Sequence, residues 1–101
     1  MREETGTIDG DVQLTSDLHL TGTIAGTAVV APGAYLILSG TIDRDLILDL
    51  GSQVDLNGTV AGDVYNRGGN LHIAGTVLGS VYREGGYTAI GPGAEIEGDV
   101  D

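Results

Sequence analysis

The sequence lacks several residue types on which small proteins commonly depend. It has no cysteine, which excludes disulfide bonds and thiolate metal sites. It also has no lysine, tryptophan or phenylalanine, and its aromatic side chains are four tyrosines. A globular domain of this size normally relies on large aromatic side chains for buried area. The apolar content is instead aliphatic and evenly spread, which favours a thin core along a repetitive chain.

Targeting and membrane-spanning segments are also missing from the sequence pattern. The start, Met1–Glu4, has no apolar region typical of a signal peptide, and no run is long enough to cross a membrane. The net charge of −11 repels nucleic acid and anionic membrane surfaces. We therefore expect a cytoplasmic protein that binds neither of them directly. The charge is compatible with simple solubility or with a basic protein partner.

Glycine is abundant, and its spacing is regular. The stretch Asn57–Val64, which reads NGTVAGDV, recurs with small changes from Thr5 to Val100. One aliphatic position of this repeat recurs every 16 to 19 residues, at Ile8, Ile24, Ile42, Val60, Val77 and Ile96. A period of about 18 residues that fills a chain is typical of a solenoid.

The repeat predicts one domain with a fixed internal anatomy. Residues 1–5 form a short charged lead, and residues 6–101 form the repeated domain. Each repeat has a short alternating strand, a glycine corner, an inward aliphatic residue, a second turn and a closing strand. Glycine or proline marks the second turns, at Pro32-Gly33, Leu50-Gly51, Gly68-Gly69 and Gly85-Gly86.

Alternation along the strands predicts further columns of inward side chains. The second column is Val12, Ala28, Leu46, Val64, Val81 and Val100, and the third is Leu20, Leu38, Leu56, Ile73 and Ile90. Equivalent strands of successive turns would pair about 4.8 Å apart and bury one continuous core. The sequence therefore predicts an all-β, single-domain parallel β-helix of about six turns.

The same chain can be read in units of six residues. Aliphatic residues fall six apart from Ile24 to Val60, so that three units make one three-sided turn. This spacing is similar to that of the left-handed hexapeptide solenoids of acyltransferases. Spacing alone leaves the handedness open.

The repeated Gly-Thr-Ile-x-Gly-Asp-Val unit resembles that of bactofilins, the polymer-forming cytoskeletal proteins of bacteria. The resemblance extends from Gly6 to Asp101. It implies a right-handed, three-sided parallel β-helix that polymerises end to end into nonpolar filaments without nucleotide. It also implies a scaffolding role, in cell shape or in localising other proteins.

The residues that could carry chemistry point away from an enzyme. The two histidines, His19 and His72, are predicted to face outward three turns apart, roughly 14 Å, which is too far to share a metal ion. A column of corner carboxylates could bind calcium between turns, but such side chains more commonly accept hydrogen bonds from turn amides. These residues are Asp11, Asp45, Asp63 and Asp99. We expect no enzymatic activity, cofactor or metal.

Two surfaces are candidate interfaces. The first is formed by the end turns, where Ile8, Val12, Leu18 and Leu20 are expected to face one open end and Ile90, Ile96 and Val100 the other. Solenoid ends normally need caps, so apolar ends favour a homopolymer. The second is an outward apolar stripe that could bind a neighbour laterally, formed by Val29, Ile47, Tyr65 and Tyr82.

The preferred function is therefore structural: self-assembly into cytoskeletal filaments by end-to-end stacking, as a scaffold for other proteins. One alternative is an acidic inhibitor, such as an immunity protein that neutralises a basic toxin nuclease, because the charge is −11. A solenoid acyltransferase is third, because neither histidine follows an inserted loop that could hold an acyl donor.

Overall fold

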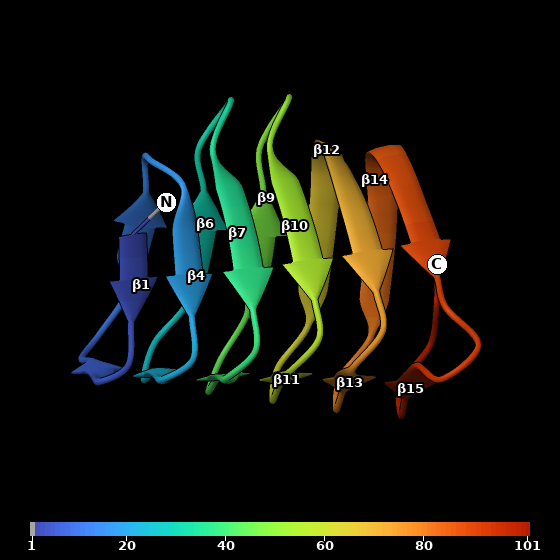
Figure 1. The fold of residues 1–101 in the computed structure, drawn as a ribbon. Coiled ribbons are helices and arrows are strands. Elements are labelled where there is room, and N and C mark those ends of the chain that lie inside the picture. The colour runs from blue at the N-terminus through green and yellow to red at the C-terminus, as the bar shows by residue number, and fades with distance from the viewer. Residues whose placement is uncertain (1) are drawn as a thin grey trace.

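The computed structural model describes residues 2–101, which form a coil of parallel strands with extents of 30 × 24 × 22 Å (Figure 1). Each turn contributes to three faces. The first face contains β1 (Arg2–Glu4), β4 (Leu18–Leu20), β7 (Tyr35–Leu38), β10 (Gln53–Leu56) and the second halves of β12 (Val64–Ile73) and β14 (Val81–Ile90). The second face contains β2 (Thr7–Ile8), β5 (Thr23–Ile24), β8 (Thr41–Ile42), β11 (Thr59–Val60), β13 (Thr76–Val77) and β15 (Glu95–Ile96). The third face contains β3 (Val12–Leu14), β6 (Ala28–Val30), β9 (Leu46–Leu48) and the first halves of β12 and β14.

The coil is right-handed. In Figure 1 the chain descends the near face, crosses below to the far face and rises there, while successive turns advance from the N-terminal to the C-terminal side. All strand pairs are parallel, as in the pairing of β7 with β4 on one side and β10 on the other. The predicted three-sided parallel β-helix is confirmed. None of residues 2–101 forms a helix of the length and hydropathy needed to span a membrane.

The core consists of stacked aliphatic columns, as the repeat predicts. The pairing register aligns the three predicted columns residue by residue, and in the middle turns their members are fully buried. The aliphatic residues spaced six apart also point inward, and all of them are fully buried: Ile24, Val30, Leu36, Ile42, Leu48, Val54 and Val60. Each turn covers the next, so no single turn has to bury its own apolar side chains.

The second corner changes between the early and the late turns. In the early turns a loop separates the third face from the first, with positive φ at Gly33 and Gly51. In the late turns β12 and β14 instead run through this corner as continuous strands, with register shifts beside Asn66. The turn predicted at Gly68-Gly69 is therefore a bend within a strand. The buried Asn66 side chain holds this bend, because its Oδ1 accepts hydrogen bonds from the amides of Gly68 and Gly69 at 3.2 and 2.8 Å.

The N-terminal lead is also more ordered than the sequence predicts. Residues 2–4 form β1, which pairs with β4 and adds a strand to the first face. Leu18 and Leu20, expected at the open end, are covered and are 1% and 0% exposed. This strand was not predicted because its side chains are charged and show no apolar alternation. Its backbone pairs with β4 without needing apolar side chains.

Stacked glycines set the close spacing at the first corner. A Cβ at Gly40, Gly58 or Gly75 would lie 1.8 to 2.1 Å from the carbonyl oxygen of the glycine one turn earlier. Such a distance is far inside van der Waals contact, and the obstacle is backbone rather than a mobile side chain. The corner therefore requires glycine for the close approach of successive turns.

This corner provides a test of the stacking. We expect Gly58→Ala to reduce the free energy of unfolding by more than about 2 kcal/mol, because the backbone of two turns must separate. Gly93→Ala is the matched control, since a Cβ there meets nothing within 4 Å, and its effect should stay within about 0.5 kcal/mol. Urea unfolding followed by circular dichroism measures both, and equal midpoints would contradict the stacking geometry.

Candidate functional site

The N-terminal end of the solenoid is covered on one of its three faces. β1 lies over Leu18 and Leu20 on the first face, so neither side chain is accessible there. On the other faces Ile8 and Val12 are half-buried and pack against the core from its edge. Of the four residues expected at this end, the structure thus brings Ile8 and Val12 to the surface.

The C-terminal end exposes the last members of the core columns. Ile90 is 43% exposed and Val100 is 37% exposed, while Ile96 is half-buried. Val100 still forms a parallel bridge with Val81, so it continues the second column. Tyr87, at an outward position of β14, is 65% exposed. All three residues expected at this end lie there.

The predicted outward stripe is a continuous ridge on the third face. Pairing aligns Val29 with Ile47, Ile47 with Tyr65 and Tyr65 with Tyr82, and all four side chains are half-buried. The rings of Tyr65 and Tyr82 stack with centroids 4.9 Å apart and planes 13° apart. We refer to these four residues as the ridge. Stacked aromatic rings form a rigid contact surface of the kind enriched at interfaces.

Two carboxylates, those of Asp63 and Asp45, influence the hydroxyl of Tyr65. Its hydroxyl donates to Asp63 Oδ2 at 3.4 Å. Desolvation by its neighbours, followed by the negative charges of Asp63 and Asp45, raises the pKa of Tyr65 above 10.0. The Tyr65 hydroxyl of the ridge is therefore held in its neutral form, beside a carboxylate-lined corner.

The corner carboxylates act as structural acceptors. Asp11 Oδ1 accepts from the Thr27 amide at 2.8 Å, and Asp45 Oδ1 accepts from the Asp63 amide at 2.9 Å. Asp63 Oδ1 accepts from the amide of Ser80 at 2.9 Å, one turn further on. Each of these three side chains thus joins its own turn to the next one, as the hydrogen-bonding alternative predicted, whereas at Asp99 the backbone amide donates to Ser80 Oγ at 3.1 Å. In residues 2–101 no group of three or more metal-ligating side chains could hold a metal ion.

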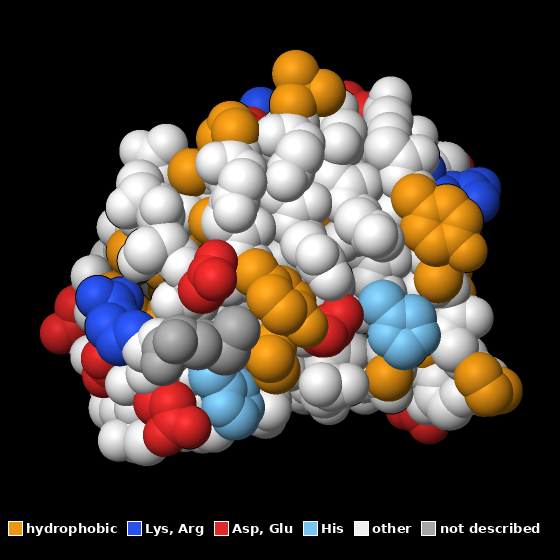
Figure 2. Space-filling model, turned by 45° about the horizontal axis from the view of Figure 1, so that its top comes forward, with side chains coloured by type: hydrophobic (Ala, Val, Ile, Leu, Met, Phe, Trp, Pro, Cys, Tyr) orange, Lys and Arg blue, Asp and Glu red, His pale blue; other side chains and the backbone are white. Residues whose placement is uncertain are grey.

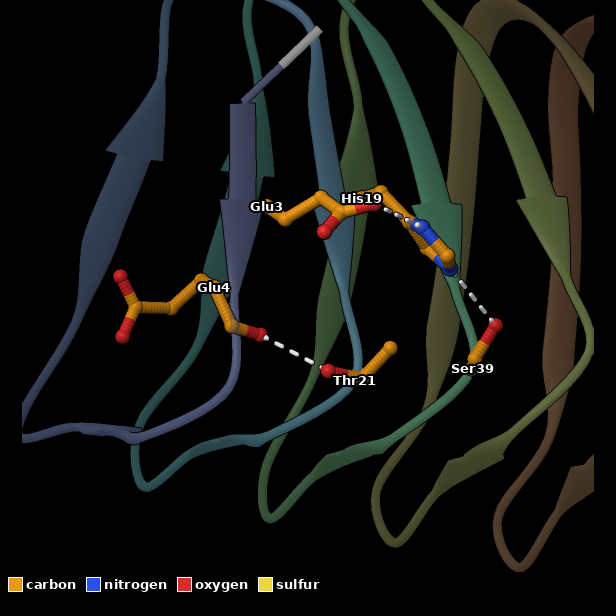
Figure 3. A network of polar contacts seen from close by, with 5 residues as sticks. All are labelled: Glu3, Glu4, His19, Thr21 and Ser39. Carbon is orange, nitrogen blue, oxygen red and sulfur yellow. Dashed lines mark hydrogen bonds and ion pairs between the residues drawn. The ribbon is translucent and has the colours of Figure 1, made fainter.

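One polar network was not found from the sequence. His19 Nδ1 lies 3.7 Å from Glu3 Oε1, and His19 Nε2 lies 3.1 Å from Ser39 Oγ (Figure 3). The order acid, imidazole, hydroxyl is that of a hydrolase triad. The acid–imidazole distance, however, exceeds a hydrogen bond, and the network lies on an open strand surface. Its residues lie on three successive turns, so it connects β1 to the body of the coil. The sequence did not indicate this network because Glu3 belongs to β1, a strand that was not predicted.

The two histidines occupy one outward column but remain apart. The column continues from His19 through Ile37 and Asp55 to His72, so the imidazoles lie three turns apart, as predicted. In Figure 2 hydrophobic and acidic side chains lie between them. Asp55 is itself engaged as the acceptor for the Tyr35 hydroxyl, and this bond is the main reason that the pKa of Tyr35 is raised.

Two shallow cavities of about 350 and 360 Å³ lie on the surface. One is at the C-terminal end and is lined by Arg83, Gly85, Gly86, Tyr87, Thr88 and Asp101. The other lies beside the ridge and is lined by Asp11, Val12, Gln13 and Val29. Neither lining includes histidine or cysteine, so neither has a nucleophile beside an imidazole base.

The corner carboxylates can be tested against a matched neighbour. We expect Asp63→Ala to reduce the free energy of unfolding by about 1 kcal/mol, because the Ser80 amide loses its acceptor. Asp63→Asn should retain most of the stability, since an amide oxygen can still accept. Asp43→Ala removes the same charge at an exposed position and serves as the control. Equal losses for Asp63→Ala and Asp43→Ala would indicate a charge effect rather than a hydrogen bond.

Comparisons with protein-family models, with curated proteins and with solved structures found no match to this chain. The fold assignment therefore rests on the strand register and on the buried columns.

Proposed function

We propose that this protein is a non-enzymatic structural scaffold of the cytoplasm that assembles end to end into filaments by stacking its β-helices. The observation that carries the proposal is the continuity of two core columns. The column of Ile8 and Ile96 and the column of Val12 and Val100 remain apolar from the first turn to the last. A second copy placed on either end would extend both columns.

Stacking of two copies would stabilise their end turns in two ways. It would bury the exposed parts of Ile90 and Val100, and apolar burial contributes about 25 cal/mol per Å². It would also give the edge strands a partner, as β-strand addition does in other assemblies. These two gains supply a driving force that needs no nucleotide. The resemblance of the repeat to bactofilins supports the same function.

A charge at the C-terminal end should block this assembly. We expect Val100→Lys to reduce or abolish filaments, because stacking would bury an unpaired ammonium group. The control is Leu50→Lys, which places the same charge on a turn, at a side chain that is 71% exposed. Sedimentation velocity and negative-stain electron microscopy measure assembly, and circular dichroism monitors the fold.

The assembly state of the unsubstituted parent protein tests the proposal directly. A parent that stays monomeric at high concentration, in both low and high salt, contradicts end-to-end assembly. Filaments that persist unchanged in Val100→Lys would place the joint elsewhere.

The ridge supports a lateral contact between neighbouring filaments or with a scaffolded protein. Its four side chains are about 4.8 Å apart from turn to turn and form a narrow apolar strip. Branched and aromatic residues also suit strand surfaces by themselves. Stacking of Tyr65 on Tyr82 is the feature that favours a contact surface, because it fixes both rings before any partner binds.

The double variant Tyr65→Ser/Tyr82→Ser should separate lateral from end-to-end contacts. We expect it to fold normally and to form single filaments, with lateral bundles or partner binding lost, because the rigid apolar part of the ridge is gone. Electron microscopy counts bundles and single filaments in the same field. Bundles that form as readily as in the parent would reduce the ridge to ordinary strand surface.

The alternative function is inhibition of a basic protein such as a toxin nuclease. The net charge of −11 favours an inhibitor. The carboxylates of Asp11, Asp45 and Asp63 contribute to this charge and lie along one corner, where Oδ1 of each is bonded within the fold. An acidic surface of this kind would accelerate association with a basic partner at low salt. An inhibitor needs no self-assembly, so a parent that remains monomeric would favour this function over the scaffold.

A further inference from the structure

Strand β1 places charged side chains where the core columns require apolar ones. Its register aligns Arg2 with Leu18 and Glu4 with Leu20, both of which face the core. Arg2 and Glu4 therefore occupy the core-facing positions of the first turn, whereas Glu3 between them faces outward beside His19. The first and third faces differ at this end, since the third face ends on the apolar Val12.

The opposite end lacks this arrangement on the same columns. The column of Glu4 and Leu20 ends at Ile90, and the column of Arg2 and Leu18 ends at the uncharged Thr88. One charged residue near this end, Arg83, occupies the position aligned with the buried Asn66, but its side chain is exposed and its Nε donates to the Asp101 carbonyl oxygen at 3.3 Å. The two ends of the first face thus present different chemistry to a second copy.

We propose that β1 is a charged cap that limits stacking at the N-terminal end, so that pairs of copies joined through their C-terminal turns accumulate before longer filaments. Stacking on β1 would bury Arg2 and Glu4 over a neighbour's core, and burying charges is costly unless they are paired. Inward-pointing charges on an edge strand are a known protection against strand pairing. The inference rests on the proposed end-to-end assembly.

The cap is fixed to the coil by several contacts. The Glu4 carbonyl oxygen accepts from the amides of Thr21 and Gly22 at 2.9 and 3.1 Å and from Thr21 Oγ1 at 3.3 Å. Glu4 Oε1 also accepts from the Gly6 amide at 3.2 Å, and Glu3 lies beside His19 (Figure 3). These contacts hold β1 in register, so Arg2 and Glu4 stay at the positions aligned with Leu18 and Leu20.

The test converts the cap into an apolar strand. Arg2→Leu/Glu4→Leu extends two columns to the end and leaves the net charge unchanged, because one positive and one negative side chain are removed. Glu3→Leu adds a leucine to the same strand but at an outward position, and it is the matched control. Each change is made in the parent and in Val100→Lys, in which the C-terminal joint is blocked. Sedimentation velocity over a concentration series reports the assemblies, with circular dichroism as the folding control.

We expect Arg2→Leu/Glu4→Leu to form larger assemblies than the parent, and to associate even in the Val100→Lys background. Glu3→Leu should behave like the parent in both backgrounds. A folded Arg2→Leu/Glu4→Leu/Val100→Lys variant that remains monomeric overturns the cap. A monomeric parent contradicts the proposed function and the C-terminal pairs, whereas the charged cap itself is upheld if Arg2→Leu/Glu4→Leu alone makes the protein associate.

Discussion

The hydrogen bonding of each turn to the next is the interaction on which the rest of this structure depends. Each turn binds the turns before and after it through parallel strands, and its aliphatic side chains are covered by theirs. This close approach explains the glycine corner, where the backbone of Gly40 occupies the place of a Gly58 side chain. It also explains the corner carboxylates, which accept hydrogen bonds from amides one turn later. The repeat in the sequence is a direct consequence of this spacing.

A structure built in this way has two special places, its ends, where a turn has a neighbour on one side. The two ends of this protein differ in structure. At the N-terminal end β1 covers Leu18 and Leu20 and brings Arg2 and Glu4 to core-facing positions. At the C-terminal end Ile90 and Val100 remain partly exposed. The exposed apolar residues of the C-terminal end favour the proposed stacking, whereas the charges of β1 would limit it at the N-terminal end.

Much of the fold could be predicted from the sequence, since the period of about 18 residues and the alternation in each strand specify which side chains face inward. The ridge was predictable for the same reason. β1 was not, because Arg2, Glu3 and Glu4 have no apolar alternation, and their strand forms through backbone pairing with β4. The continuous bend of β12 was also missed. It depends on the buried Asn66 amide, and a side chain's hydrogen-bond partners cannot be read from residue spacing.

Residue-resolved amide hydrogen exchange at increasing protein concentration tests the central claim most directly. We infer that the end turns join copies of this protein into a filament. The account predicts that the amides of Thr88 and Ile90, which point away from β12, exchange at least about tenfold more slowly at high concentration, as a second copy covers this part of β14. The amides of Asn57 and Gly58, bonded to the Leu38 carbonyl oxygen inside the stack, should not change. Exchange that is independent of concentration throughout the last turn would contradict the account.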